Sequence, residues 1–200
     1  MNTVRALNKQ HIAAFFDGRA ANWDRETVYR EPIIQEILDR AEICGGIDVL
    51  DVACGTGVLF ADYLQRKVAS VTAIDLSAEM VRRARAKFPG VRVICGDAEE
   101  EAFSQKYDVI MIFDAFPHFV DHARLIENLS AQLKPGGRLC IAHDMSRDEL
   151  NRHHWCIAQD VSSELPKADE LSALLSVHLT VDTVISDEEK YIVSGIKKDS

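Results

Sequence analysis

The sequence lacks the features that mark several classes of protein. No apolar run in its 200 residues approaches the roughly 18 residues that a membrane-spanning helix needs. The stretch from Met1 to Asn8 lacks the charged-then-apolar pattern of a secretion signal. The five cysteines are scattered without a Cys-x-x-Cys pair, so they are expected to be reduced thiols rather than a disulfide framework. We therefore expect a cytoplasmic protein that does not insert stably into membranes.

Positive charge is also scarce. Lysine and arginine together number 23 against 32 aspartates and glutamates, which gives a formal net charge of −9. This balance leaves no broad basic surface for a nucleic acid backbone. A small molecule is therefore the expected partner, and the expected assembly is a monomer or a homodimer. With 200 residues and 47% hydrophobic content, the chain can build one globular core.

Short β-type runs alternate with helical patterns along the chain. Strands are predicted over 47–52, 70–74, 91–95, 107–113, 138–143, 178–185 and 191–196. This alternation is typical of a parallel sheet with helices on both faces. The short connection 186–189 permits an antiparallel hairpin between the last two strands. The predicted fold is therefore α/β, with a seven-stranded, mostly parallel sheet and an antiparallel C-terminal hairpin.

Helical patterns divide the chain into two parts. Two such patterns precede the first strand, so residues 1–45 are predicted to be an N-terminal helical segment and residues 46–200 one globular domain. Farther on, Pro135 with the two following glycines is predicted to stop a helix and turn the chain into the fifth strand. Ser146 with Glu149 three residues later predicts the start of another helix.

A glycine-containing loop follows the first predicted strand, from Asp51 to Gly57. Glycines here let backbone amides approach a ligand at a helix start. A dinucleotide motif would carry a third glycine where this chain has Phe60. Asp51 would repel a pyrophosphate but suits a cofactor bearing an ammonium and a sulfonium. Asp75 ends the second strand, where a carboxylate can accept both hydroxyls of a ribose.

Four segments in this order and spacing resemble the successive motifs of class I S-adenosylmethionine-dependent methyltransferases. They are Asp51-Val-Ala-Cys-Gly-Thr-Gly57, Ile74-Asp-Leu-Ser-Ala-Glu-Met80, Gly96-Asp-Ala98 and Leu133-Lys-Pro-Gly-Gly-Arg-Leu139. Residues 16–24 resemble the N-terminal segment of the ubiquinone/menaquinone-biosynthesis C-methyltransferase type, with Trp23 in place of the usual tyrosine.

The resemblance implies a Rossmann-like methyltransferase fold in which the N-terminal segment is a lid over the cofactor. S-adenosylmethionine would be the cofactor and S-adenosylhomocysteine the product. The cofactor residues that it implies are Asp51, Ala53, Gly55, Gly57, Asp75, Leu76, Met80, Asp97, Ala98, Phe113 and Trp23. Asp75 would hold the ribose and Asp97 the adenine amino group, whereas Met80 either flanks the adenine or belongs to the core. The acidic residues 99–101 after Asp97 are expected to be solvated.

Histidines gather where the substrate of such a fold would lie, at the carboxyl ends of the strands. His118 follows the fourth strand, His143 ends the fifth, and His153 lies on the next predicted helix. These three are predicted to orient or deprotonate the acceptor, although each also fits a packing role. His153 and His154 point about 100° apart on a helix, so only one can face a pocket. A divalent metal ion held by His143, Asp144 and one of this pair is a chemical alternative, but no metal site is predicted, because these ligands come from separate segments.

Aromatic residues in the same segments offer apolar walls that would exclude water from the transfer. The candidates are Phe15, Phe16, Trp23, Phe116, Phe119 and Trp155. Each of these rings alternatively belongs to the core.

The sequence thus predicts a methyltransferase that acts on a small-molecule acceptor. The alternative is a non-catalytic S-adenosylmethionine-binding sensor or partner subunit, which the titratable residues at the strand ends disfavour. A nicotinamide oxidoreductase is disfavoured by Phe60 in the glycine motif. The acceptor atom, whether carbon, oxygen, nitrogen or sulfur, does not follow from the sequence.

Overall fold

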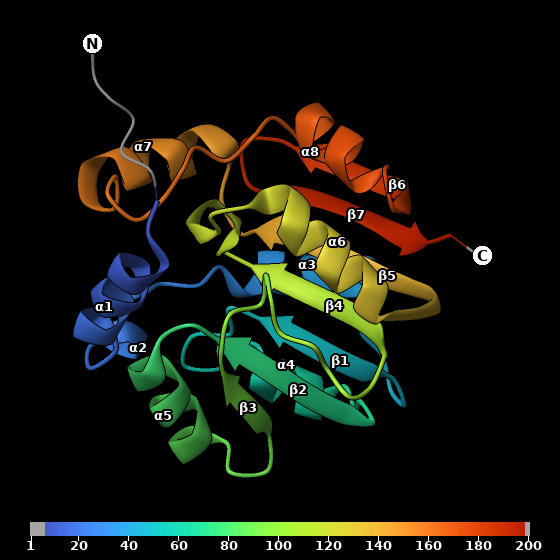
Figure 1. Ribbon diagram of the computed structural model, residues 1–200, viewed down its shortest axis with the longest axis horizontal. Helices are drawn as coiled ribbons and strands as arrows, with labels where there is room; N and C mark the ends of the chain where they lie inside the picture. The colour runs from blue at the N-terminus through green and yellow to red at the C-terminus, as the bar shows by residue number, and fades with distance from the viewer. Residues whose placement is uncertain (1–6, 199–200) are drawn as a thin grey trace.

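The computed structural model describes residues 7–198 as one sheet with helices on both faces (Figure 1). Residues 1–6, which hold most of the stretch examined for a secretion signal, and residues 199–200 lie outside the described part. Among residues 7–198, no helix is both long enough and apolar enough to cross a membrane.

The sheet contains seven strands in the order β3-β2-β1-β4-β5-β7-β6. Their bounds are β1 (Asp48–Val52), β2 (Ser70–Asp75), β3 (Arg92–Cys95), β4 (Tyr107–Phe113), β5 (Leu133–His143), β6 (Leu179–Ser186) and β7 (Tyr191–Lys197). The first five strands pair in parallel, and β7 runs antiparallel to both β5 and β6. The predicted fold class, including its C-terminal hairpin, is confirmed.

The start of β5 differs from the prediction. The strand begins at Leu133, which pairs with Tyr107, while Arg138 pairs with Val109. The residues between them therefore form a bulge within the strand rather than a separate turn. A Cβ atom at Gly137 would lie only 2.9 Å from the carbonyl oxygen of Tyr107, so the bulge requires a glycine at this close approach.

Eight α-helices are present in residues 7–198, together with the 3₁₀ turn η1 (Phe116–His118). They are α1 (Lys9–Arg19), α2 (Trp23–Glu26), α3 (Glu31–Arg40), α4 (Phe60–Gln65), α5 (Ala78–Lys87), α6 (His122–Gln132), α7 (Arg147–Ile157) and α8 (Ala168–Leu175). The predicted helix start at Ser146 is confirmed, since its hydroxyl accepts the backbone N–H of Glu149. Ser77 and Asp121 cap α5 and α6 in the same way, each accepting a backbone N–H from three residues ahead.

Two apolar cores lie on opposite faces of the sheet. The central strand β4 serves both: Met111 packs into the core that contains α3 and α4, and Ile112 packs into the core that contains α6 and α8. Burial on both faces explains the unbroken apolar sequence of this strand.

The N-terminal segment is divided between two roles. Helix α3 packs into the core through Ile34, Ile37 and Leu38. Helices α1 and α2 instead lie beyond the carboxyl ends of the parallel strands (Figure 1). A lid function for residues 1–45 stays a prediction, and α1 and α2 are the part of this range placed to serve it.

Candidate cofactor site

A pocket opens at the carboxyl ends of β1 to β4 and is covered by α1 and α2. Ten of the predicted site residues line it: Trp23, Ala53, Gly55, Asp75, Leu76, Met80, Asp97, Ala98, Phe113 and His118. The other four, Asp51, Gly57, His143 and His153, do not line it. The pocket lies where open α/β sheets bind their ligands.

The glycine loop between β1 and α4 turns through three residues with positive φ. Ala53 has φ 57°, Gly55 has φ 55° and Gly57 has φ 86°. A Cβ atom at Gly57 would approach the ring of Phe60 to 2.6 Å. Gly57 therefore makes room for the buried Phe60, whereas Gly55 faces the pocket beneath Trp23.

Asp75 ties the glycine loop to the start of α5. Its Oδ2 atom accepts the backbone N–H of Gly55 at 2.8 Å, and its Oδ1 atom accepts that of Ser77 at 2.8 Å. Burial raises the pKa of Asp75 to about 6. Each carboxylate oxygen can still accept another hydrogen bond. Two acceptor oxygens side by side fit the two hydroxyl donors of a vicinal diol, so the site matches the ribose of a nucleoside.

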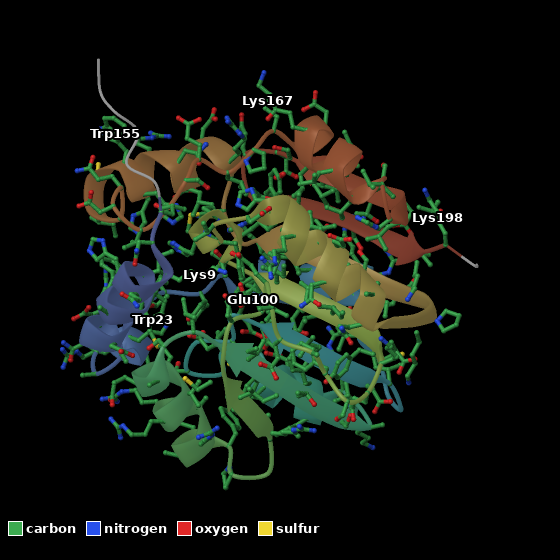
Figure 2. All side chains as sticks on the ribbon, viewed as in Figure 1. Lys9, Trp23, Glu100, Trp155, Lys167 and Lys198 are labelled. Carbon is green, nitrogen blue, oxygen red and sulfur yellow. The ribbon has the colours of Figure 1, made fainter. Side chains whose placement is uncertain are left out.

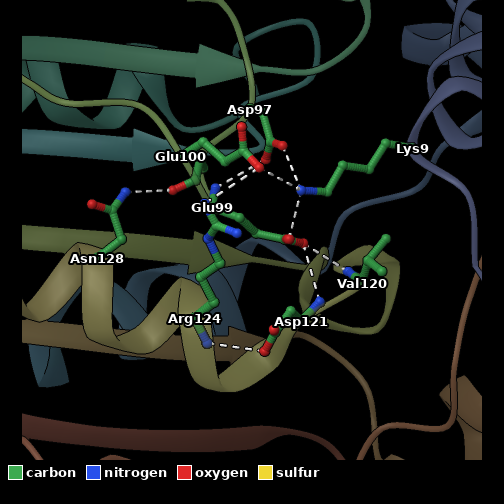
Figure 3. Close-up of polar contacts among 9 residues, drawn as sticks. Lys9, Asp97, Glu99, Glu100, Val120, Asp121, Arg124 and Asn128 are labelled. Atoms are coloured by element: carbon green, nitrogen blue, oxygen red, sulfur yellow. Dashed lines mark hydrogen bonds and ion pairs between the residues drawn. The ribbon is translucent and has the colours of Figure 1, made fainter.

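Lys9 of α1 closes the pocket at its β3 end (Figure 3). Its Nζ atom lies 2.5 Å from Asp97 Oδ2 and 2.7 Å from Glu99 Oε2. Burial opposes the charge on Lys9, but hydrogen bonds to both carboxylates outweigh it and raise the Lys9 pKa. Glu99 is buried and also accepts the N–H of Val120 at 2.8 Å. The expectation that Glu99 is solvated is therefore wrong.

Two further contacts fix the N-terminal segment to the cofactor loops. Asp24 bonds to the hydroxyl of Thr56 in the glycine loop and to Lys87 Nζ at 2.9 Å. Asp17 Oδ1 accepts the Ser77 hydroxyl at 2.5 Å, at the loop after β2. With the lysine of α1, the segment thus contacts the loops after β1, β2 and β3 in turn. The sequence analysis does not predict these contacts, because the two residues of each contact are distant along the chain.

His118 lies in η1 at the pocket wall. Its Nδ1 atom is 2.9 Å from the carbonyl oxygen of Val161, and its ring centroid is 4.9 Å from that of Phe16. Burial lowers the His118 pKa to about 4. At neutral pH the ring is uncharged, donates Nδ1–H to the carbonyl and keeps Nε2 as an acceptor. A role toward the acceptor stays a prediction.

The other two histidines lie away from the pocket lining. His143 is fully buried and neither ring nitrogen has a hydrogen-bond partner. His153 is exposed on α7, and the neighbouring His154 is the one that turns inward, 4.9 Å from the His118 ring. Burial lowers the His154 pKa to about 3. Contact with the acceptor is therefore supported by position for His118 alone.

No metal site is formed within residues 7–198, since no three histidine, cysteine or acidic side chains are arranged to hold an ion. His143, Asp144 and the histidine pair of α7 are accordingly not assembled into one.

A carboxyl pair lies at the ends of β4 and β5. Asp114 lines the pocket with φ 51°, and its Oδ1 atom accepts the backbone N–H of Asp144 at 3.1 Å. Asp144 is buried and accepts the backbone N–H of Arg30 at 2.9 Å. Burial, followed by the charge of Asp114, raises the Asp144 pKa to about 6. Both residues directly follow adjacent strands, which is the sequence signal that marks them.

Asp51 lies below the glycine loop rather than in the pocket. It is buried near Tyr63, and burial raises its pKa to about 8. At neutral pH this carboxyl is therefore mostly protonated, so the predicted attraction to a cationic cofactor has no charged partner here. A cofactor role for Asp51 stays a prediction that the pocket lining does not support.

The aromatic wall is smaller than expected. Phe16, Trp23 and Phe119 line the pocket. Phe116 is fully buried and stacks on His122 instead. Trp155 is 69% exposed on the outer side of α7 (Figure 2), so its predicted place in the wall is wrong.

Comparisons with known proteins agree with this geometry. Residues 49–137 match the family described as methyltransferase domain. A malonyl-[acyl-carrier protein] O-methyltransferase from Acetivibrio thermocellus is 31% identical over 141 residues, covering 68% of this chain and 50% of that protein. A ubiquinone biosynthesis O-methyltransferase from Serratia proteamaculans is 34% identical over 155 residues, covering 69% and 63%. This chain therefore spans about half to two thirds of the length of these relatives.

The fold is shared with solved structures. The DhpI–SAH complex aligns with a TM-score of 0.77 and 20% identity, over 99% of this chain and all of that one. Fold and pocket together define an α/β domain that binds a nucleoside-type cofactor at the ends of parallel strands. Residues 49–137 thus carry a methyltransferase domain, and the chain is similar to class I, S-adenosylmethionine-dependent methyltransferases.

Proposed function

We propose that this protein transfers the methyl group of S-adenosylmethionine to a small-molecule acceptor and releases S-adenosylhomocysteine. The observation that carries the proposal is Asp75, held by the amides of Gly55 and Ser77 on the pocket wall. Its free acceptor capacity suits two ribose hydroxyls. The matched family and the O-methyltransferase relatives support the same activity.

Three loops of the pocket would each contact a different part of the cofactor. Asp75 would hold the ribose and Asp97 the adenine amino group, with Leu76 and Met80 beside the base. Gly55 lets the loop approach the methionine part under Trp23. The three loops follow strands β3, β2 and β1, which are neighbours in the sheet, and this order supports the proposed division.

The reaction asks little covalent chemistry of the chain. S-adenosylmethionine supplies an activated methyl group on a sulfonium. The protein binds donor and acceptor in line and keeps water out, which is the main source of acceleration for such a displacement. Helices α1 and α2, through Phe16 and Trp23, cover the pocket and supply the apolar side of this exclusion.

A small acceptor fits this covered pocket and the net charge of −9. The same charge balance disfavours a nucleic acid substrate. We further propose that the protein works in the cytoplasm as a monomer or a homodimer.

Calorimetric titration with S-adenosylmethionine, S-adenosylhomocysteine and NADH tests the proposal. We expect binding of the first two and none of NADH. A protein that binds NADH, or none of the three, would overturn the assignment. Binding without turnover of any acceptor would instead favour a sensor or partner subunit.

A further inference from the structure

The pocket has two ends that the sheet order separates. The loops after β3 and β2, with Asp97 and Asp75, lie on one side of the glycine loop after β1. Asp114 at the end of β4 lies on the other side. If the first side takes the adenosine, the acceptor meets the transferred methyl group on the side of Asp114.

The carboxyl groups at the Asp114 end are not paired with a lysine or arginine side chain of the described residues. Among residues 7–198, neither Asp114 nor Asp144 forms an ion pair with a lysine or arginine. The nearby Arg30 side chain is directed to Glu149 instead, with Nη2 at 3.0 Å from both carboxylate oxygens. Arg30 reaches Asp144 only through its backbone N–H.

The adenosine end of the pocket shows the opposite arrangement. There Lys9 contacts both Asp97 and Glu99, and Asp75 accepts two backbone N–H groups. A pair of adjacent carboxyl groups without a cation is costly in a partly buried site. Among residues 7–198, the carboxyl pair of Asp114 and Asp144 thus differs from the pair of Asp97 and Glu99, which share the cation of Lys9.

A buried imidazole points at the same carboxylate. His143 is 0% exposed, both of its ring nitrogens lack hydrogen-bond partners, and Nδ1 lies 3.4 Å from Asp114 Oδ1. An unpartnered polar group in such a place is uncommon in a folded protein. The described residues therefore leave hydrogen-bonding capacity unused beside the Asp114 carboxylate.

Aromatic rings flank this end of the pocket. Tyr29 and Phe113 both line it, with ring centroids 6.4 Å apart. Trp23 Nε1 donates to the Tyr29 hydroxyl at 3.1 Å, which fixes the tyrosine ring. Aromatic faces attract cations, so the Tyr29 and Phe113 rings would strengthen the attraction of the carboxylates for a positively charged ligand.

From these contacts we infer that the acceptor is an amine, which binds as an ammonium ion to Asp114 with Asp144 behind it. The inference rests on the proposed methyltransferase function and names its substrate class. Asp114 touches the substrate, whereas Asp144, whose backbone N–H donates to Asp114 Oδ1, positions it. The net charge of −9 would also favour the approach of a cation.

In the transfer, the bound ammonium first gives one proton to the carboxyl pair and becomes a neutral amine. Its nitrogen lone pair forms the new bond to the methyl carbon while the carbon–sulfur bond breaks, and that electron pair stays on the sulfur of S-adenosylhomocysteine. The methylated product leaves as an ammonium ion, and the carboxyl pair returns its proton to solvent.

The test compares amines with their neutral and anionic counterparts. Purified protein at saturating S-adenosylmethionine is given a panel of small amines, each matched by the alcohol or phenol and the carboxylic acid of the same carbon skeleton. Release of S-adenosylhomocysteine and the product mass are measured. We expect turnover to be confined to the amines. Preferred turnover of hydroxyl or carboxyl compounds, or no turnover of any amine by protein that binds the methyl donor, overturns the inference.

The variant Asp114→Asn separates this inference from the proposed function. Asparagine tolerates the positive φ of 51° at this position, so the backbone is preserved while the charge is lost. We expect kcat/KM for the best amine to fall roughly tenfold to a hundredfold, the range for a lost charged hydrogen bond, mainly through KM. The Kd for S-adenosylhomocysteine should not change.

A matched control is Asp148→Asn, an 86% exposed carboxylate on α7 that should leave both constants unchanged. If Asp114→Asn weakens S-adenosylhomocysteine binding instead, Asp114 serves the amino group of the cofactor and the amine inference fails. If the unaltered protein does not bind the cofactor at all, the proposed function itself has failed.

Discussion

The adenosine end and the acceptor end of the pocket differ in how their acidic groups are satisfied. At the adenosine end, Asp75 accepts two backbone N–H groups and Asp97 is paired with Lys9. At the acceptor end, Asp114 and Asp144 lie together without a lysine or arginine partner in the described part of the chain. At the adenosine end Asp97 already has a cation and Asp75 has room only for hydroxyl donors, whereas the acceptor end gains from a ligand that brings positive charge.

This difference predicts that the two ends respond differently to the removal of a carboxylate. Removing a satisfied carboxylate strands the donors that it serves, which costs the full desolvation of those donors. Removing one of two adjacent, unneutralised carboxylates relieves repulsion.

The largest expected effect comes from Asp75→Ala. The variant loses the ribose acceptor and leaves the amides of Gly55 and Ser77 without their partner. We expect the Kd for S-adenosylmethionine to rise about a hundredfold or more, as two charged hydrogen bonds are lost. Calorimetry measures this, with the exposed Asp39→Ala as the control. Retained affinity in the folded variant would show that Asp75 does not hold the cofactor.

The next effect concerns the backbone of the adenosine end. Gly57→Ala places a Cβ atom 2.6 Å from the Phe60 ring at a φ of 86°. We expect a loss of about 2 to 4 kcal/mol of stability from overpacking and backbone strain together. Thermal unfolding measures it, and Gly18→Ala is the control because its Cβ would meet no atom within 4 Å. An unchanged Tm would mean that the loop and Phe60 do not pack as described.

A smaller effect is expected for Lys9→Met, which keeps the length of the side chain and removes its charge. Asp97 and the buried Glu99 lose their cation, so α1 should hold the pocket closed less well. Because Lys9 is part-exposed, we expect S-adenosylmethionine affinity to fall only about threefold to tenfold. Titration at low and high salt checks it, since the effect should shrink with salt.

Lys198→Met is the control for this variant, since within residues 7–198 Lys198 donates to the Ser176 carbonyl and forms no ion pair with an acidic residue. Equal affinities for the Lys9 and Lys198 variants would show that the ion pairs do not contribute to closure.

The smallest expected effect is on folding stability and concerns Asp144 at the acceptor end of the pocket. The folded-state pKa of Asp144 is raised to about 6 from an ordinary value of 3.8. A carboxyl with a raised folded pKa favours the folded state at low pH, and that contribution is lost as the pH rises from about 4 to about 6. Asp144→Asn removes the ionisable group and with it this pH-dependent loss of folding stability. The asparagine amide oxygen can still accept the Arg30 N–H.

We therefore expect Asp144→Asn to be more stable than the unaltered protein at pH 8. The gain should be about 1 kcal/mol, less than the roughly 3 kcal/mol that corresponds to the whole pKa shift, because the amide replaces one acceptor oxygen of the carboxyl with a donor. The gain should vanish near pH 4. Urea unfolding at both values measures it. A loss of stability at pH 8 would mean that the Asp144 charge is satisfied in the folded state.

The sequence predicted the parts that depend on short segments. Strand positions, capping residues and the glycine loop each follow from patterns within about ten residues, and the structure confirms them. The start of β5 was missed because the proline and glycines of the bulge have the local signature of a turn, while the pairing of Leu133 with Tyr107 depends on a neighbouring strand.

Contacts between distant segments could not be read in this way. Lys9 and Asp97 are 88 residues apart, so neither position signals the other. The inward direction of His154 depends on how α7 is rotated against η1, which tertiary packing decides. The same applies to Glu99, whose burial depends on the loop that contains Val120.

The three ties of the N-terminal segment also set an order of assembly during synthesis. Asp24 pairs with Thr56, Asp17 with Ser77 and Lys9 with Asp97, at separations of 32, 60 and 88 residues. Each step adds one strand–helix unit, so each tie can form only when the next unit has left the ribosome. The N-terminal segment can thus be bound to the sheet only in a fixed order. Asp24 can bind first, Asp17 second and Lys9 last, as the later strands emerge.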